Sequence, residues 1–160
     1  MPNLQRPKER FKEIYFYQND KEKNIRCDAC LSKCADDPHD KIVICETCNV
    51  GTHQSCYGRE LLDNVPAGEW NCERCSTLLK NKDKSVRSIK CKLCYDPKGV
   101  IVKVNRFEDA AMKRVVAREE WYHVTCINHH LKISFNEPWC PSRKKIIIDT
   151  TKVIGSVNPF

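Results

Sequence analysis

The sequence has few glycines, few aromatic residues and no long hydrophobic run. Five of its 160 residues are glycine and 8% are aromatic, whereas 31% are charged. No apolar segment is long enough to span a membrane, and the charged first ten residues contain no apolar core of a secretory signal. We therefore expect no membrane partner and a reducing compartment, in which cysteines bind metal and do not form disulfides.

Catalytic signatures are also missing. The chain has no HExxH, no HxE followed by PCxxC, and no glycine-rich phosphate loop. Its Leu, Ile, Val and Phe residues are scattered among dense charge, so the sequence does not predict one large core. We expect no enzymatic activity and no catalytic residue, and we expect bound metal to replace burial as the main source of stability.

What the sequence has in abundance is cysteine, with twelve residues. Eight candidate metal ligands form four regularly spaced pairs. The pairs are Cys27/Cys30, Cys45/Cys48, His53/Cys56 and Cys72/Cys75. Two ligands separated by two residues suit one tetrahedral zinc, with each sulfur about 2.3 Å from the ion. Because His53 follows Cys48 by only five residues, neighbouring pairs cannot easily share an ion. The spacing thus predicts a cross-brace, in which pairs one and three bind one zinc and pairs two and four bind another.

A third zinc site is predicted farther along the chain. Its two ligand pairs, Cys91/Cys94 and His123/Cys126, are separated by 28 residues. Each of the three predicted sites has four protein ligands and no open position for catalysis. Four candidate ligands remain. These are Cys34, which could replace Cys27 beside Cys30, and Cys140, His129 and His130, which could serve the third site; we expect all four to be unligated.

The ligand order resembles that of a PHD finger: four cysteines, one histidine and three cysteines, with Trp70 two residues before Cys72. In the related RING finger the histidine comes fourth. Residues 48–58 resemble most closely the PHD fingers of the BRPF and Jade scaffold subunits of histone acetyltransferase complexes, and residues 121–126 resemble the zinc knuckle that follows them. The cysteines of the second PHD finger are absent, as in a fragment of a larger scaffold or a protein that lost that finger.

The resemblance implies a small, loop-rich, zinc-stabilised α+β fold: a cross-braced PHD finger followed by a zinc knuckle with short β-strands. The expected divisions are a polar N-terminal segment (1–26), the PHD-type finger (27–75), a basic linker (76–90), and the knuckle with a truncated extended-PHD-like region (91–160). Within them we expect strands at 41–45, 131–135 and 145–149, a short helix at 110–118, and a small core of Leu61, Leu62, Val65 and Trp70.

Charge is distributed unevenly. Residues 27–75 carry nine acids and four bases, whereas residues 76–160 carry seventeen bases and eight acids. An acidic module beside a basic one suits a partner of both signs, such as a histone tail lying beside DNA, although an ordinary solvated surface is the alternative. The residues expected to contact nucleic acid are Lys80, Lys82, Lys84, Arg87, Lys90 and Lys92.

The resemblance implies that the N-terminal tail of histone H3 adds as a strand beside residues 41–45. The loop at 65–68 would hold its α-amino group, Glu46 would face its first arginine, and Asp37 or Asp40 its first lysine. The expected tail-binding residues are Asp37, Asp40, Lys41, Ile42, Val43, Ile44, Glu46, Pro66, Ala67 and Gly68.

The aromatic cage that trimethyl-lysine readers require is absent. Its defining tryptophan would occupy the position of Gly51, and residues 27–56 contain no Phe, Trp or Tyr. The resemblance, together with this absence, therefore implies a nuclear reader of the unmodified tail, working with other subunits of a chromatin-modifying complex. The alternatives are a structural zinc scaffold for protein assembly and a RING-like ubiquitin ligase.

Overall fold

The computed structural model describes residues 8–20, 25–32, 37–58, 61–62, 67–109, 113–130, 133–135 and 145–148. The elements, in chain order, are η1 (Glu9–Ile14), β1 (Ile42–Ile44), β2 (Gly51–His53), α1 (Gln54–Tyr57), α3 (Glu73–Lys80), η2 (Val86–Ser88), β3 (Ile101–Asp109), β4 (Val115–His123), α4 (Val124–Asn128), β5 (Ile133–Phe135) and β6 (Lys145–Ile148). None of the described helices has the length and apolarity needed to cross a bilayer.

The first module is built on the short antiparallel pair of β1 and β2. The expected strand at 41–45 is three residues long, with β-branched Ile42, Val43 and Ile44. The backbone leaves β1 at Cys45 because Asn49 adopts a left-handed conformation that closes the tight turn into β2. This turn sets two predicted metal ligands, Cys45 and Cys48, side by side.

The N-terminal segment packs on the first module and does not extend from it. Phe11 and Ile14 of η1 are buried. Farther on, the buried Asn19 side chain donates a hydrogen bond of 2.7 Å to the Asp28 carboxylate. η1 lies against η2, within the expected basic linker.

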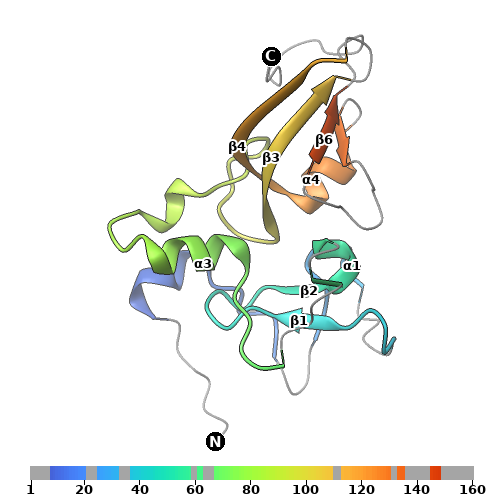
Figure 1. Cartoon of the computed structure of the whole chain (residues 1–160). Coiled ribbons are helices and arrows are strands. Elements are labelled where there is room, and N and C mark those ends of the chain that lie inside the picture. Colours follow the sequence, from blue (N-terminus) through green and yellow to red (C-terminus); the bar gives the residue numbers. More distant parts are fainter. Residues whose placement is uncertain are drawn as a thin grey trace, which may run out of the picture.

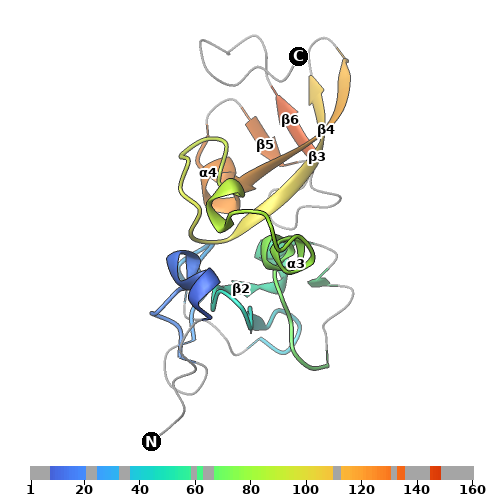
Figure 2. The ribbon, with the colours of Figure 1, turned by 90° about the vertical axis from the view of Figure 1, so that its left-hand side faces the viewer.

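A helix occupies the start of the expected basic linker. α3 runs to Lys80, and Leu78, Val86 and Ile89 are buried, so residues 76–90 are packed structure. Both views place α3 between the β1–β2 pair and the second sheet (Figures 1 and 2). A hydrogen bond of 3.1 Å from the Lys103 amide to the Glu73 carboxylate joins α3 to β3.

The second module is a four-stranded sheet in the order β4-β3-β6-β5. β3 is central, antiparallel to β4 and parallel to β6, and strands at the expected positions near 131–135 and 145–149 complete the sheet. β3 and β4 have nine residues each, longer than the short strands predicted. The expected helix at 110–118 is wrong over its described end, because β-branched Val115 and Val116 pair with β3.

The prediction that no single core would form is also wrong. Buried apolar side chains form one cluster that extends from Phe11 through α3 to Ile148. In the expected finger core Leu61 is buried and Trp70 packs edge-on against Tyr57 with ring centroids 5.1 Å apart. Leu62 is 38% exposed and does not belong to it, and Val65 lies outside the described residues.

Candidate metal centres and docking strand

Three clusters of cysteine and histidine occur in the described part of the chain, and they match the three groups expected from spacing. In each one the four ligand atoms all lie within 4.8 Å of one another. The clusters are Cys27/Cys30/His53/Cys56, Cys45/Cys48/Cys72/Cys75 and Cys91/Cys94/His123/Cys126. Pairs one and three, and pairs two and four, are therefore interleaved as a cross-brace.

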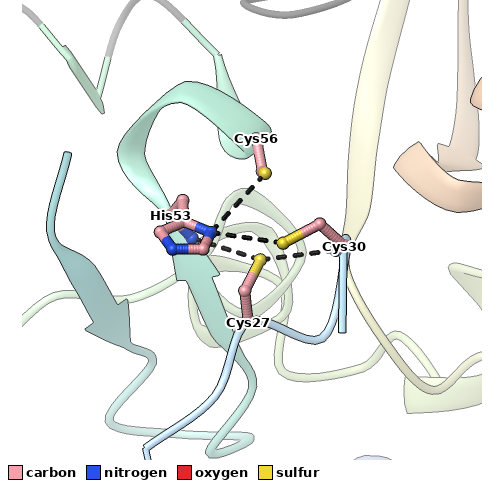
Figure 3. Close-up of side chains that lie close together, drawn as sticks. All are labelled: Cys27, Cys30, His53 and Cys56. Atoms are coloured by element: carbon pink, nitrogen blue, oxygen red, sulfur yellow. Dashed lines mark hydrogen bonds between the residues drawn. The ribbon is translucent and has the colours of Figure 1, made fainter. Parts of the chain in front are cut away.

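The first cluster gathers ligands from two separate segments (Figure 3). His53, at the end of β2, points its Nδ1 toward the sulfurs of Cys30 and Cys56, at 3.3 and 3.8 Å. The His53 amide also donates to the Cys27 sulfur at 3.3 Å. Amide hydrogen bonds to sulfur stabilise the thiolate form, which is the form that binds metal.

The second cluster is fully buried and consists of four cysteines. The sulfurs of Cys48 and Cys72 are 3.9 Å apart. A tetrahedral zinc with sulfur ligands about 2.3 Å away holds them about 3.8 Å apart, so this separation fits the ion. The Cys72 amide donates to the Cys45 sulfur at 3.3 Å, which parallels the bond in the first cluster.

The third cluster belongs to the second module and repeats the first. His123 Nδ1 lies 3.1 and 3.7 Å from the sulfurs of Cys94 and Cys126. The other ring nitrogen, Nε2, hydrogen-bonds the carbonyl of Lys98. This partner fixes the proton on Nε2 and leaves Nδ1 free to bind metal.

Within the clusters, hydrogen bonds and burial shift the pKa values of neighbouring thiols in opposite directions. A hydrogen bond from Cys56 is the main cause that lowers the pKa of Cys27 to about 4, and the same contact raises the pKa of Cys56. Burial opposes ionisation of Cys91, but hydrogen bonds from His123 lower its pKa to about 6. Burial and the charge of Cys91 raise the pKa of Cys126 to about 12. A divalent ion would stabilise all the thiolates together, and the three clusters fit three zinc ions.

The sequence did not reveal that a buried arginine accompanies the second cluster. Arg74 has no exposed surface, and its Nη1 donates to the carbonyl of Pro97 in the second module. Nε and Nη2 have no hydrogen-bond partner among the described residues. Burial works to lower the pKa of Arg74, but the charge of the cluster's thiolates outweighs it and raises the pKa. The guanidinium thus offsets the negative charge of a zinc site with four thiolates.

Replacing Arg74 with methionine is expected to destabilise the zinc-loaded chain by about 3–5 kcal/mol, because it leaves the thiolate charge and the Pro97 carbonyl without their partner. Urea unfolding and the rate of zinc transfer to a chelator measure the effect. Arg87→Met is the matched control, since the Arg87 side chain is 70% exposed. Unchanged unfolding of Arg74→Met would contradict the assigned role.

Comparison with known proteins agrees with this geometry. Residues 39–76 match the protein-family model of the PHD finger. The chain contains a PHD finger. The matched stretch begins after Cys27 and Cys30. In the structure these two cysteines complete the first cluster with His53 and Cys56.

Similar proteins share more than the PHD finger. PHD finger protein rhinoceros of Drosophila melanogaster is 30% identical over 105 residues, 66% of this chain and 2% of that protein. Protein Jade-1 of Mus musculus is 30% identical over 117 residues, which are 73% of this chain and 11% of that protein. E3 ubiquitin-protein ligase Jade-2 of Homo sapiens is 28% identical over 135 residues, which are 84% of this chain and 14% of that protein. The chain therefore corresponds to a small part of each relative, and the Jade-2 match extends through both the PHD finger and the third cluster.

Among the described residues, β1 pairs with a neighbouring strand along one edge only, and the other is called its open edge. Gln54 N–H donates to Lys41 C=O and Cys45 N–H to Val50 C=O, so residues 41, 43 and 45 face β2. Because main-chain groups alternate along an antiparallel strand, those of Ile42 and Ile44 point the other way. No described residue forms a backbone hydrogen bond with them. Within the predicted strand 41–45, only Ile42 and Ile44 therefore have main-chain groups that a peptide could pair with. The Lys41 amide donates to the side-chain oxygen of Gln54 at 2.8 Å.

The three predicted acidic contacts differ in their surroundings. Asp37 is exposed, and one of its oxygens accepts the His39 amide at 2.8 Å. Both oxygens of Asp40 are already hydrogen-bonded to Ser55, at 2.9 and 2.6 Å, where they cap α1 beside the first cluster. Substitution of Asp40 would thus disturb the fold, and Asp37 is the cleaner candidate for a lysine contact.

The loop expected to hold the peptide's amino group is attached to the end of β1. The Glu46 amide donates to the carbonyl of Trp70 at 2.8 Å, which ties the end of this loop to the chain two residues past β1. Ala67 and Gly68 are exposed. A Cβ at Gly68 would meet open space, so the turn does not depend on glycine there. Pro66 lies outside the described residues.

The predicted nucleic-acid contacts are all on the surface. Lys80, Lys82, Lys84, Arg87, Lys90 and Lys92 are exposed. Two of them have partners: Arg87 forms an ion pair of 2.5 Å with Glu13, and Lys90 lies 5.5 Å above the Tyr95 ring.

Two of the four leftover candidate ligands lie in the described part of the chain. His129 and His130 follow α4 and belong to none of the metal clusters found among the described residues. Cys34 and Cys140 lie outside the described residues.

Proposed function

We propose that this chain is a chromatin-associated nuclear module that binds the unmodified N-terminal tail of histone H3, within a chromatin-modifying complex of the histone acetyltransferase type. The open edge of β1 is the observation that carries the proposal, since Ile42 and Ile44 offer two N–H and two C=O groups to an extended peptide. In this proposal the twelve clustered residues are zinc ligands, and the eight of the first two clusters hold that edge in place.

The peptide runs antiparallel to β1. Its N-terminus then lies at the Ile44 end, where the hydrogen bond from the Glu46 amide to the Trp70 carbonyl ties the 67–70 loop to the chain just past β1. Its first lysine is proposed to lie toward the other end and to meet Asp37. An α-ammonium group at one end and a lysine ammonium at the other would each meet hydrogen-bond acceptors.

Steric exclusion at Gly51 supports a preference for the unmodified tail. A Cβ at this position would lie 2.3 Å from the carbonyl oxygen of Arg26 and 3.2 Å from the Asn19 side chain. The tryptophan that defines the trimethyl-lysine cage therefore has no room in this PHD finger. Trimethylation would remove the ammonium donors of lysine with no aromatic rings to compensate.

Titration of the zinc-loaded chain with unmodified and lysine-4-trimethylated H3 peptides tests the function. We expect the unmodified peptide to bind about tenfold more tightly, because a charge-assisted hydrogen bond contributes roughly 1.5–3 kcal/mol. Asp37→Asn keeps an acceptor for the His39 amide and removes the charge, so it should weaken the unmodified peptide and reduce the difference. Tighter binding of the trimethylated peptide would overturn the proposal.

The exposed basic residues between Lys80 and Lys92 favour DNA as a second partner. Arg10 donates to the carbonyls of Asn81 and Lys84, at 2.8 and 3.0 Å, and so fixes the turn that displays Lys82 and Lys84. Binding to duplex DNA should be nonspecific and should weaken steeply as salt rises, because counterions are released. Lys82→Gln/Lys84→Gln should weaken it further, and salt-independent binding, or none at low salt, would remove DNA from the proposal.

The chain itself is proposed to have no catalytic activity. Each cluster supplies four protein ligands and leaves no open coordination position. The relative named as a ubiquitin ligase keeps a RING-like activity as the alternative, with a purely structural zinc scaffold as the other. A ubiquitin-transfer assay with the zinc-loaded chain separates these cases, since transfer would establish the ligase, and failure to bind any H3 peptide would leave the scaffold.

A further inference from the structure

Ser85 ends the turn that joins α3 to η2, residues 81–85. Every residue from 79 to 85 is exposed, and the Ser85 backbone is extended, with φ −63° and ψ 139°. The Ser85 hydroxyl oxygen accepts a hydrogen bond of 3.3 Å from the Arg87 amide. Exposed loop tips are the segments that enzymes acting on a folded chain, such as proteases, reach most easily. The Ser85 hydroxyl is therefore open to a modifying enzyme.

Basic residues flank Ser85 on both sides. Lys82 and Lys84 stand three and one residues before it, and Arg87 stands two residues after it. Asp83 is the one acid between residues 80 and 90. Because protein kinases select their substrates partly by charge, an acidic substrate groove favours a serine with such neighbours. The pattern fits a serine/threonine kinase that selects basic flanks.

A hollow of about 350 Å³ lies beside Ser85, between η1 and η2. Its charged lining residues are Arg10, Lys12, Lys84, Glu9 and Glu13. Glu13 is already paired with Arg87 at 2.5 Å, so the three cations outweigh the remaining acid. One water occupies about 30 Å³ in the liquid, so the hollow has room for a phosphate group. It therefore offers positive charge and space to an anion attached to Ser85.

From these observations we infer that Ser85 is a phosphorylation site, and that its phosphate docks in this hollow and blocks DNA binding by the 81–85 turn. The inference rests on the proposed function, because it regulates the proposed DNA contact. The Ser85 oxygen attacks the γ-phosphorus of ATP, the bond to the oxygen that bridges to the β-phosphorus breaks and releases ADP, and the hydroxyl proton passes to a base of the kinase. The product carries about −1.5 to −2 charges at pH 7 and three acceptor oxygens.

The phosphate acts on the residues that are proposed to contact DNA. Lys84 both lines the hollow and belongs to the exposed turn. A phosphate on Ser85 would pair with Lys84 and Lys12, and its charge would repel the DNA backbone from Lys82. Because each lost contact lowers the slope of log affinity against log salt by about 0.9, the loss of two reduces affinity about tenfold to a hundredfold at roughly 0.1 M salt.

Ser88 is the matched control for the site of modification. It is also exposed and directly follows Arg87, but it does not line the hollow, and its hydroxyl donates to the Ser85 carbonyl at 2.6 Å. Treating the zinc-loaded chain with ATP and a kinase that selects basic flanks should place phosphate on Ser85 in preference to Ser88, as mapped by mass spectrometry. Phosphate on Ser88 or another residue, with none on Ser85, would overturn the inference.

Titration with duplex DNA measures the consequence. The phosphorylated chain should bind about tenfold to a hundredfold more weakly than the unmodified chain, with a lower dependence on salt. Ser85→Ala changes no charge, so it should bind DNA like the unmodified chain, and treatment with the kinase should no longer weaken its binding.

Phosphorus NMR tests whether the phosphate docks in the hollow. Nearby cations favour the dianion, so the pKa of the phosphate should be lower in the chain than in a short phosphopeptide with the sequence of residues 80–90. Lys12→Gln should raise the pKa, because Lys12 lines the hollow from η1. Equal pKa values in the chain and the peptide would overturn docking.

The outcomes separate this inference from the proposed function. If the unmodified chain does not bind DNA at low salt, the DNA partner fails and the regulation with it, while the phosphorus NMR titration still decides whether the phosphate docks. If the unmodified chain binds DNA and the phosphorylated chain binds it equally well, only the regulation by Ser85 is overturned.

Discussion

Removing zinc is expected to unfold the PHD finger, and the single substitution Cys72→Ala should have the same result. Cys72 is buried in the four-cysteine cluster, whose ligands come from the end of β1 and the start of α3. A structural zinc site contributes roughly 10–16 kcal/mol, as much as the whole stability of an ordinary domain. The loss of one ligand therefore removes the connection between these two elements.

Native mass spectrometry and circular dichroism measure this outcome. The parent chain should carry three zinc ions, and Cys72→Ala should lose metal and structure together. Cys34→Ala is the control and should be nearly silent, because Cys34 is predicted to be unligated. Two ions in the parent, a disulfide, or equal damage from both substitutions would refute the ligand scheme.

Acetylation of the H3 peptide's N-terminus is expected to abolish measurable binding. It removes the α-ammonium charge at the end of the peptide that faces the 67–70 loop beside β1. Losing charge-assisted hydrogen bonds of roughly 1.5–3 kcal/mol each weakens affinity by about tenfold to a hundredfold or more. A fluorescence titration measures the change.

The control peptide for acetylation is amidated at its C-terminus, far from the loop, and should bind like the parent peptide. If the acetylated peptide binds equally well, the 67–70 loop does not hold the amino group, and the antiparallel direction of the added strand is wrong.

Ligand spacing predicted the metal clusters because zinc coordination has few solutions. Two ligands separated by two residues suit the same ion. The short interval between Cys48 and His53 makes it hard for neighbouring pairs of ligands to share one. The structure gathers the ligands in that interleaved order. Local chemistry was sufficient here.

Contacts between distant segments were not predictable in the same way. Phe11 and Ile14 follow a short apolar pattern that fits a free turn as well as a packed one, and only their burial in the shared core decides. Arg74 looked like an ordinary charged residue of a helix, but the fold closes the second module over it and supplies the thiolate charge that permits burial.

Pairing partners explain the remaining differences. The 110–118 region has charged and small residues that suit a helix, yet Val115 and Val116 lie opposite Glu108 and Phe107 of β3. Cross-strand packing outweighed local propensity there. Likewise, the strand predicted at 41–45 is present as β1, but which of its main-chain groups point away from β2 could be known only from the register of β1 on β2.

A backbone N-methylation scan of the H3 peptide tests strand addition on β1 most directly. Methylating one backbone nitrogen of the peptide at a time removes single N–H donors without changing any side chain of the peptide. Because only alternate residues of an added strand face Ile42 and Ile44, affinity should fall at every second position near β1 and stay nearly constant at the positions between them. A uniform loss along the peptide, or no loss at any position, would contradict binding by strand addition.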